Sequence, residues 1–303
     1  MNVAVTGATG TIGRAVVEAL LERGDSVVAL SRSAASAREK LGHVEVHEWP
    51  DPKGSPAPAA AFAEADGVIH LLGEPVAQRW SDEAKAEIRD SRVLGTRNLV
   101  EGIRSGAGPR LRVLVSQSAI GFYGAHGDET VDESEPPGSG FLADVVVAWE
   151  AEARAGSDEL GLRTPICRTG VVLSPSGGAL EEMLTPFKLG VGGPVAGGRQ
   201  YTPWIHIDDV VGALLFALDN DGADGPLNLT APEPVTNKEL SKALGRALHR
   251  PSVVPVPGFA IKLLYGEMAT IVTTGVRAVP KRLLELGYTF KRADLAEALA
   301  AAL

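Results

Sequence analysis

The chain has 303 residues, enough for one or two domains with a large buried core. Hydrophobic residues make up 45% of it and charged residues 22%, as in an ordinary globular enzyme, and the formal net charge of −9 argues against a nucleic-acid-binding surface. The single cysteine excludes an internal disulfide and a cysteine metal cluster.

Apolar runs of strand length alternate with helical patterns over the first 172 residues. The runs that predict strands are Val3–Thr6, Val27–Leu30, Val44–His47, Val68–Leu72, Leu111–Ser116 and Thr164–Val172. The segments that predict helices are Thr11–Arg23, Ala34–Leu41, Ser81–Ser105 and Leu142–Leu160. This alternation predicts an α/β fold with a Rossmann-type, doubly wound parallel sheet. In such a sheet ligands bind at the carboxyl ends of the strands.

The pattern changes beyond residue 172, where paired glycines interrupt the chain. Helical patterns return near Asp208–Leu218, Lys238–Leu248, Phe259–Tyr265 and Asp294–Leu303. We therefore predict a Rossmann domain over residues 1–172 and a smaller, mainly helical domain over residues 173–303 that covers the mouth of the sheet. Residues 201–225 are expected to return to the first domain.

The sequence shows neither a membrane-spanning segment nor a secretory signal. No apolar run approaches the roughly 18 residues of a membrane span, and the longest, Val210–Leu218, suits a core helix. The N-terminus has neither a charged lead-in nor a cleavage site. We expect a cytoplasmic protein with no membrane partner, no nucleic-acid partner and no metal.

Three glycines stand where the first predicted strand turns into the first helix. Gly7 permits a tight turn, Gly10 lets a phosphate approach the backbone, and Gly13 lets the helix pack closely on the sheet. The amides and the dipole of the helix then face the negative charge. This context predicts that a dinucleotide pyrophosphate is bound by Gly7, Thr9, Gly10, Thr11, Ile12 and Gly13.

The second predicted strand ends in Ser31 and Arg32, with no carboxylate at that strand end. Enzymes that select NAD usually place an acidic residue here for the ribose 2′-hydroxyl, whereas an arginine accommodates the 2′-phosphate of NADP. Arg32 is a permanently charged planar donor, and Ser31 adds a hydrogen-bonding hydroxyl. The sequence therefore favours NADP over NAD.

Motifs along nearly the whole chain point to one family. The broader set is Thr6-Gly7-x-x-Gly10-x-x-Gly13, Ser116-Gln117-Ser118-Ala119-x-x-Phe122-Tyr123-Gly124 and Trp204-Ile205-His206-Ile207-Asp208-Asp209. It resembles the extended short-chain dehydrogenase/reductase superfamily, and most closely its nucleotide-sugar epimerase/dehydratase branch. A narrower set resembles an atypical "epimerase family" subgroup that carries a C-terminal domain of unknown function: Gly73-Glu74-Pro75, Arg79-Trp80, Trp149-Glu150-Ala151-Glu152-Ala153, Gly192-Gly193-Pro194 and Gly198-Arg199-Gln200.

The resemblance implies cofactor roles at matching positions. They fall on Ser31, Arg32, Leu72, Gly73, Glu74, Arg79 and Glu150. Glu74 follows the fourth predicted strand, where a carboxylate can accept ribose hydroxyls, and Arg79 can bind phosphate through two hydrogen bonds. Trp49, after the third predicted strand, lies either against the adenine or in the core. Glu150 is either a cofactor ligand or a solvated carboxylate on a helix.

The acid–base couple of the superfamily is missing. Its members use a Tyr-x-x-x-Lys pair, in which the lysine lowers the tyrosine pKa so that the tyrosine can transfer a proton during hydride transfer. The residues four positions after the four tyrosines here are Gly127, Ile205, Ala269 and Arg292. The helix that should carry the pair places apolar residues at its positions. The usual oxidoreductase or epimerase mechanism is therefore in doubt.

A few residues remain as catalytic or substrate-binding candidates. Ser118 matches the serine that orients the substrate oxygen in the superfamily, and Tyr123 is the nearest proton donor, unless it packs beneath the loop. His206 is either a further donor or a structural residue at a helix start that Asp208 caps. Arg199, in a glycine-rich stretch, is either an anion clamp for the substrate or a solvated arginine.

Three functions stay open at this stage. The chain is an NADP-dependent epimerase or oxidoreductase with another proton donor, an NADP(H)-binding redox sensor without turnover, or a regulatory interaction protein, since some members of the family carry division-inhibitor names. The resemblance implies a small-molecule, nucleotide-sugar-like substrate. It also implies a homodimer formed through helices that flank the sheet.

Overall fold

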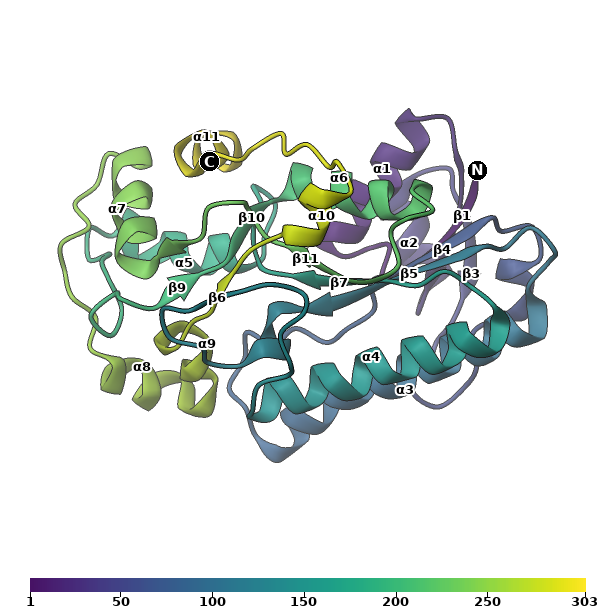
Figure 1. The fold of residues 1–303 in the computed structure, drawn as a ribbon, viewed down its shortest axis with the longest axis horizontal. Coiled ribbons are helices and arrows are strands. Elements are labelled where there is room, and N and C mark those ends of the chain that lie inside the picture. The colour runs from purple at the N-terminus through teal and green to yellow at the C-terminus, as the bar shows by residue number, and fades with distance from the viewer.

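A seven-stranded parallel sheet runs through the centre of the computed structural model, which describes all 303 residues (Figure 1). Its strands, in spatial order, are β11 (Gly225–Leu229), β7 (Pro165–Thr169), β5 (Val113–Ala119), β4 (Gly67–His70), β1 (Asn2–Thr6), β2 (Ser26–Ser31) and β3 (Glu45–Glu48). Strands buried on both faces have continuous rather than alternating apolar runs, as in Val3–Val5 of β1 and Val68–Ile69 of β4. The predicted doubly wound parallel sheet is confirmed.

Helices cover both faces of the sheet. On one face α1 (Thr11–Glu22) and α6 (Ile207–Asp219) share a buried apolar cluster with β1, while α2 (Ala34–Leu41) packs beside β3 at the edge. On the other face α3 (Asp82–Gly106) and α4 (Phe141–Leu160) run side by side (Figure 1). Between α3 and the sheet lies the 3₁₀ helix η1 (Ala59–Phe62), and a second one, η2 (Ile120–Tyr123), follows β5.

The last predicted strand of the first domain divides in two. The chain leaves the main sheet after β7 at Gly170 and forms β8 (Val171–Leu173), which pairs with β10 (Trp204–His206). The chain can leave the sheet here because Gly170 has no side chain and the backbone of Pro203 lies close to it. A Cβ at Gly170 would lie 3.2 Å from the carbonyl carbon of Pro203. The segment after residue 200 then returns to the sheet through α6 and continues to Leu229 in β11, a strand that the sequence did not predict.

Most of the remaining elements gather at the end of the molecule opposite the N-terminus, whereas the helix Lys281–Glu285 packs against β11 of the main sheet (Figure 1). The helices are α5 (Ala179–Lys188), α7 (Asn237–Ala247), α8 (Gly258–Tyr265), η3 (Gly266–Ala269), α9 (Thr270–Thr273), α10 (Lys281–Glu285) and α11 (Leu295–Ala302). The short strands are β6 (Thr130–Val131), β9 (Tyr201–Thr202), β12 (Val235–Thr236) and β13 (Arg277–Ala278). A separate apolar cluster joins α5, α7 and α11 around Trp204, so this region has a core of its own.

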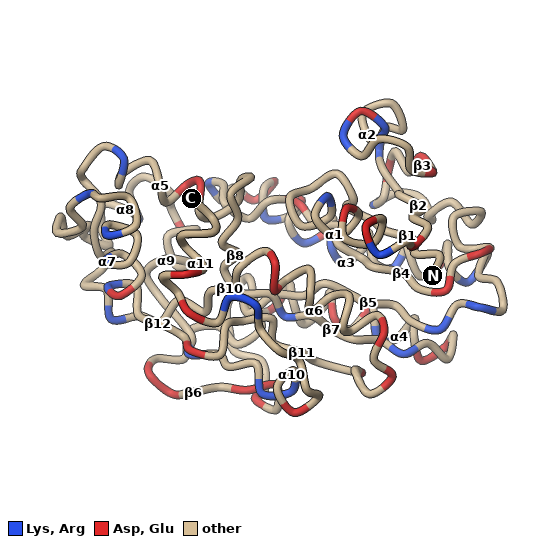
Figure 2. Tube along the Cα trace, turned by 90° about the horizontal axis from the view of Figure 1, so that it is seen from above, with Lys and Arg blue, Asp and Glu red and all other residues tan.

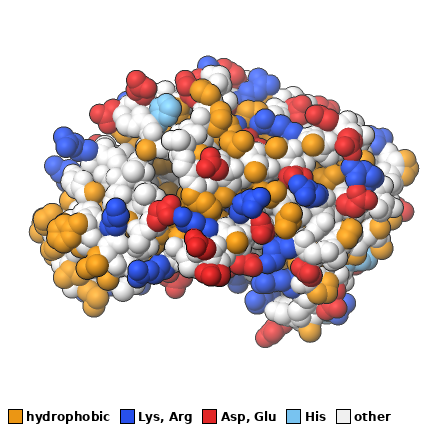
Figure 3. All heavy atoms as spheres, turned by 90° about the horizontal axis from the view of Figure 1, so that it is seen from below, with side chains coloured by type: hydrophobic (Ala, Val, Ile, Leu, Met, Phe, Trp, Pro, Cys, Tyr) orange, Lys and Arg blue, Asp and Glu red, His pale blue; other side chains and the backbone are white.

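The surface is mixed in character. Figure 2 shows Lys and Arg interspersed with Asp and Glu along the trace. Apolar side chains gather at one end of the molecule, visible in Figure 3, where Phe259, Leu263 and Leu264 of α8 are exposed. None of the helices combines the length and the apolar character that a membrane crossing requires.

Candidate functional site

The glycine loop between β1 and α1 has the geometry of a phosphate cradle. Gly7 has φ +63°, and a Cβ there would lie 2.5 Å from the Leu71 carbonyl oxygen, so only glycine fits this turn. A Cβ at Gly13 would lie 2.8 Å from the Ala8 Cα, which explains how α1 packs against the loop. At Gly10 a Cβ would lie 3.3 Å from the Gly7 carbonyl oxygen, a tight contact with the turn, although the residue itself is exposed.

The amino end of α1 offers its amides to a ligand. Gly10 is the N-cap residue, no side chain caps the helix, and no acidic residue lies in its first turn. Uncapped amides and the helix dipole together favour an anion. Thr9, Thr11 and Ile12 are partly exposed beside this end, as the prediction requires. The residues present therefore fit a dinucleotide pyrophosphate.

A buried hydrogen-bonded bridge supports the loop from below. The Thr6 hydroxyl accepts a hydrogen bond from the Leu71 amide (3.1 Å) and is hydrogen-bonded to His70 Nδ1 (2.7 Å), and the other ring nitrogen of His70 is hydrogen-bonded to the Thr96 hydroxyl (2.9 Å). Complete burial lowers the pKa of His70 to about 3. The neutral ring thus joins β1, β4 and α3 directly beneath the glycines, a role that the sequence-based predictions did not include.

The residues predicted to select NADP lie at the end of β2. Arg32 is exposed, and the Ser33 hydroxyl accepts from the Ser36 amide as the N-cap of α2. Glu48 ends the neighbouring strand β3, opposite Ser31 in the register. One of its carboxylate oxygens accepts from the Ala34 amide at 2.8 Å, so Glu48 serves as a second cap of α2.

The loop after β4 is held by an arginine that the sequence analysis missed. Arg92 of α3 donates from one nitrogen to the carbonyls of Glu74 (2.9 Å) and Ile88 (3.0 Å), and its guanidinium lies 5.3 Å from the centre of the Trp149 ring. Burial lowers the pKa of Arg92 to about 10, although the Glu74 carboxylate opposes the shift. A Cβ at Gly73 would lie 3.0 Å from this guanidinium. Arg92 is therefore a partly buried cation beside the predicted ribose-binding carboxylate.

Three further residues were predicted to contact the cofactor: Leu72 and Arg79 have exposed surface, whereas Trp49 is buried. Leu72 is partly exposed and lies against α3, and Arg79 is exposed beside Gly266. The prediction that Trp49 contacts adenine is wrong for this structure. Its side chain is only 3% exposed in an apolar cluster, and its indole nitrogen donates to the Ser55 carbonyl at 2.9 Å, so Trp49 is the core residue of the alternative.

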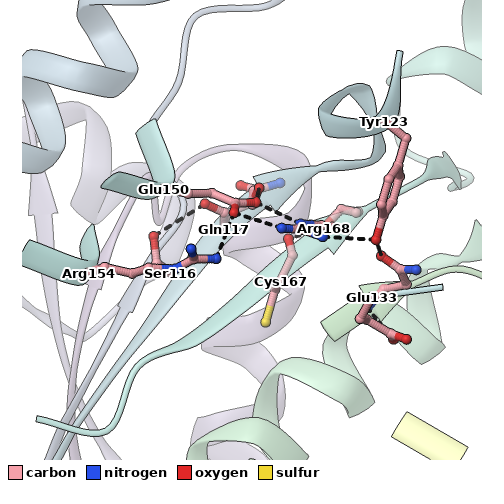
Figure 4. Close-up of polar contacts among 11 residues, drawn as sticks. Ser116, Gln117, Tyr123, Glu133, Glu150, Arg154, Cys167 and Arg168 are labelled. Carbon is pink, nitrogen blue, oxygen red and sulfur yellow. Dashed lines mark hydrogen bonds and ion pairs between the residues drawn. The ribbon is translucent and has the colours of Figure 1, made fainter. Parts of the chain in front are cut away.

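A row of polar side chains crosses the sheet near the carboxyl ends of β5, β7 and β11. Ser118 on β5 pairs in register with Arg168 on β7, which pairs in turn with Asn228 on β11. Residues opposite one another on neighbouring strands point to the same face. The carboxylate of Glu150 on α4 approaches this row and binds Arg168 through two hydrogen bonds, of 2.8 and 3.0 Å (Figure 4).

Glu150 has neither of its predicted roles. It is 3% exposed, so it is not a solvated carboxylate, and its oxygens accept hydrogen bonds from Ser118 (2.6 Å), Arg168 and Arg154 (3.0 Å) rather than facing a ligand. Burial alone would lower the pKa of Arg168, but the hydrogen bonds and the charge of Glu150 outweigh burial and raise it. The Ser118 hydroxyl is likewise 1% exposed and committed to Glu150, which corrects the prediction that it orients a substrate.

Tyr123 is also built into this network. Its hydroxyl donates to Asn228 Oδ1 (2.8 Å) and accepts from Arg168 (2.9 Å), and the side chain is fully buried (Figure 4). Burial raises the pKa of Tyr123, although Arg168 opposes the rise. A tyrosine that transfers a proton at neutral pH needs the opposite shift. The structure therefore supports the alternative for Tyr123, a tyrosine packed beneath the loop.

The remaining candidates give no replacement for the missing couple. Helix α4 contains neither tyrosine nor lysine. His206 is 2% exposed and is itself the N-cap of α6, since its Nδ1 accepts from the Asp208 amide at 3.1 Å; the expected cap by Asp208 is wrong. Burial lowers the pKa of His206, which makes it a neutral structural residue. Arg199 is exposed in its loop, and its role as an anion clamp stays a prediction.

Comparison with known proteins places these features in a family. The model of the NAD dependent epimerase/dehydratase family matches residues 3–229, and a domain of unknown function, DUF1731, matches residues 256–302. A chloroplastic SDR39U1 homologue of the epimerase family from Arabidopsis thaliana is 40% identical over 99% of this chain and 86% of its own length.

Two solved structures resemble the fold. The human epimerase family protein SDR39U1, crystallised with NADPH, has a TM-score of 0.88 and 32% identity over 100% of this chain and 99% of its own. MoeE5 in complex with UDP-glucose and NAD has a TM-score of 0.78 and 22% identity over 100% of this chain and 97% of its own. At that identity the second likeness concerns the fold alone.

Proposed function

Because this chain belongs to the NAD-dependent epimerase/dehydratase family, we propose that it binds NADP(H) at the carboxyl edge of its sheet. The observation that carries the proposal is the uncapped amino end of α1, set in a glycine loop in which Gly10 is exposed. The NADPH in the human relative supports the choice of nucleotide. Arg32 would hold the 2′-phosphate, and Glu74 with Arg92 would hold the ribose side.

The reaction is the second part of the proposal. Bound nicotinamide supplies hydride chemistry, while the protein supplies binding and orientation. We infer a small-molecule, nucleotide-sugar-like substrate and turnover as an oxidoreductase or epimerase with a proton donor other than Tyr123 or Ser118. The homodimer stays a prediction, and the molar mass in solution tests it.

A second candidate function is NADP(H) binding without turnover, as a redox sensor. Two observations favour it: α4 has no tyrosine or lysine, and both the Ser118 hydroxyl and the Tyr123 hydroxyl are bound within the chain. The two candidates share the cofactor site and differ only in what happens beside the nicotinamide.

A cofactor titration tests the shared part. Calorimetry of NADPH and NADH against the wild type should show a preference for NADPH, and Arg32→Glu should reverse it because a carboxylate repels the 2′-phosphate and accepts ribose hydroxyls. Arg38→Glu on the exposed side of α2 makes the same change in charge and serves as the control. If Arg32→Glu left the ratio of the NADPH and NADH affinities unchanged, the assignment of Arg32 to the 2′-phosphate would be contradicted. If neither nucleotide bound to the wild type, the proposal that the protein binds NADP(H) would be refuted.

A turnover screen separates the two candidates. NADPH-loaded protein is mixed with nucleotide sugars, carbonyls and quinones while the absorbance of the reduced nicotinamide is followed. Loss of absorbance that depends on an intact cofactor site, with Gly10→Ala as the inactive reference, supports an enzyme. Tight NADPH binding with no loss across the screen supports the sensor.

A further inference from the structure

Arg277 lies at the junction between the main sheet and the C-terminal elements. It stands on β13, which pairs with Thr130 of β6. Its neighbours Val276 and Ala278 are buried in one apolar cluster with Tyr123. Because side chains alternate along a strand, Arg277 points to the other face, where its guanidinium lies 5.0 Å from the centre of the Tyr201 ring.

The guanidinium of Arg277 lacks an anionic partner. Its Nε is buried and forms no hydrogen bond, and the residue belongs to none of the ion pairs of the chain. Two other arginines with little exposure are different: the partly buried Arg163 donates to three carbonyls, and the buried Arg168 binds Glu150. An unpaired buried donor is unfavourable, and a ring face offsets only part of its cost.

The position of Arg277 is fixed from both sides. A Cβ at Gly275 would lie 2.7 Å from the Tyr201 nitrogen, so the glycine allows this segment to lie directly against β9. The Gly275 carbonyl accepts from the His126 amide at 3.0 Å. On the other side the Ala278 carbonyl accepts from the Thr230 hydroxyl at 3.3 Å. The backbone on either side of Arg277 is therefore held in place before any ligand arrives.

This position adjoins the carboxyl edge of the sheet. Thr230 directly follows β11, and Asn228 within β11 donates to the Val279 carbonyl at 3.0 Å. Arg277 therefore lies beyond the carboxyl ends of β7 and β11, whereas the glycine loop lies beyond that of β1. A ligand placed between these strand ends would have the dinucleotide on one side and Arg277 on the other.

We propose that Arg277, supported by the Tyr201 ring, binds an oxyanion of the second ligand, a phosphate or a carboxylate group. The inference rests on the proposed function only for the presence of NADP(H) beside that ligand. A guanidinium is suited to this task because its planar fork matches two oxygens of either group. Arg277 is better suited to bind an oxyanion than Arg199, because its backbone is held on both sides, whereas Arg199 is exposed and follows two glycines in a loop.

Anion titrations test the proposal. NADPH-loaded protein is titrated calorimetrically at low ionic strength with inorganic diphosphate and, separately, with succinate, which distinguishes a phosphate site from a carboxylate site. We expect wild type to bind at least one of them, Arg277→Gln to weaken that binding about tenfold or more, and Arg277→Lys to lose less. Arg246→Gln, an exposed arginine on α7, is the matched control and should change the affinity less than twofold.

The outcomes separate this inference from the proposed function. If NADPH does not bind, the proposed function fails, and the titrations are repeated on the free protein, where the difference between wild type and Arg277→Gln still reports on Arg277. Circular dichroism verifies folding, and Tyr201→Leu removes the supporting ring if Arg277→Gln does not fold. No binding of either anion to wild type, equal affinity in Arg277→Gln, or a stronger effect of Arg199→Gln would overturn the inference.

Discussion

Removing the charge of Glu150 should strongly destabilise the fold. In Glu150→Gln the shape of the side chain is kept, but the Arg168 guanidinium, 2% exposed, loses its counter-charge. The new amide NH₂ group also faces the donors of Arg168 or Ser118, which then cannot both be satisfied. Breaking a buried ion pair by removing one partner costs about 3–5 kcal/mol of unfolding free energy. Total stabilities of about 5–15 kcal/mol make this a large fraction.

The same carboxylate offers a matched control. Arg154 also binds Glu150, at 3.0 Å, but its side chain is 48% exposed, so Arg154→Gln should cost about 0–1 kcal/mol. The assay is urea unfolding at neutral pH, with slope and midpoint compared among wild type and the two variants. A double variant, Glu150→Leu with Arg168→Met, should recover stability relative to Glu150→Gln because no buried charge remains. Equal losses in Glu150→Gln and Arg154→Gln would refute the reasoning.

Two further predictions concern the glycine loop and its support. The neutral state of His70 contributes stability that is complete above pH 6.5 and is lost as the pH falls toward its folded pKa of about 3, so the unfolding free energy at pH 5 should be about 2 kcal/mol lower than at pH 7. His70→Gln should flatten that slope and exposed His249→Gln should not; identical slopes would contradict the assignment. Gly13→Ala should lower stability by about 1–3 kcal/mol and weaken NADPH binding, since its Cβ would collide with the loop backbone. Gly10→Ala, whose Cβ would meet only the Gly7 carbonyl oxygen, at 3.3 Å, should weaken NADPH binding with a smaller loss of thermal midpoint than Gly13→Ala, and a matching loss of stability in both would argue against the cradle.

The fold was readable from the sequence because its signals are local. Strand runs, helical periodicity and the turn glycines each occupy a short window, and β1, α1 and the loop between them lie where predicted. Strand β11 was not predicted because its sequence begins with Gly225 and Pro226, two residue types that are rare within strands, and leaves only a short apolar signal. The split at Gly170 depends on the approach of Pro203, a contact from a distant part of the chain.

The candidate site was predictable only where a motif is contiguous. The cofactor loop belongs to that class. The pairing of Glu150 with Arg168 depends on α4 lying over β7, and nothing in either segment alone marks it. Arg92 has the appearance of a solvated helix arginine until the loop after β4 folds over it. Histidine at the end of an apolar strand, as at His70, was the one overlooked signal that the sequence did carry.

The buried network limits what chemistry the protein itself can perform. A tyrosine transfers a proton at neutral pH only when its pKa is lowered, and burial raises that of Tyr123 while Arg168 and Asn228 occupy its hydroxyl. The position that orients a substrate oxygen elsewhere in the superfamily is Ser118, and here its hydroxyl serves Glu150. The polar row therefore stabilises the sheet at the place where the superfamily performs acid–base catalysis. Selectivity for a second ligand must then come from the C-terminal side of the site, where the Nε of Arg277 is buried without a partner.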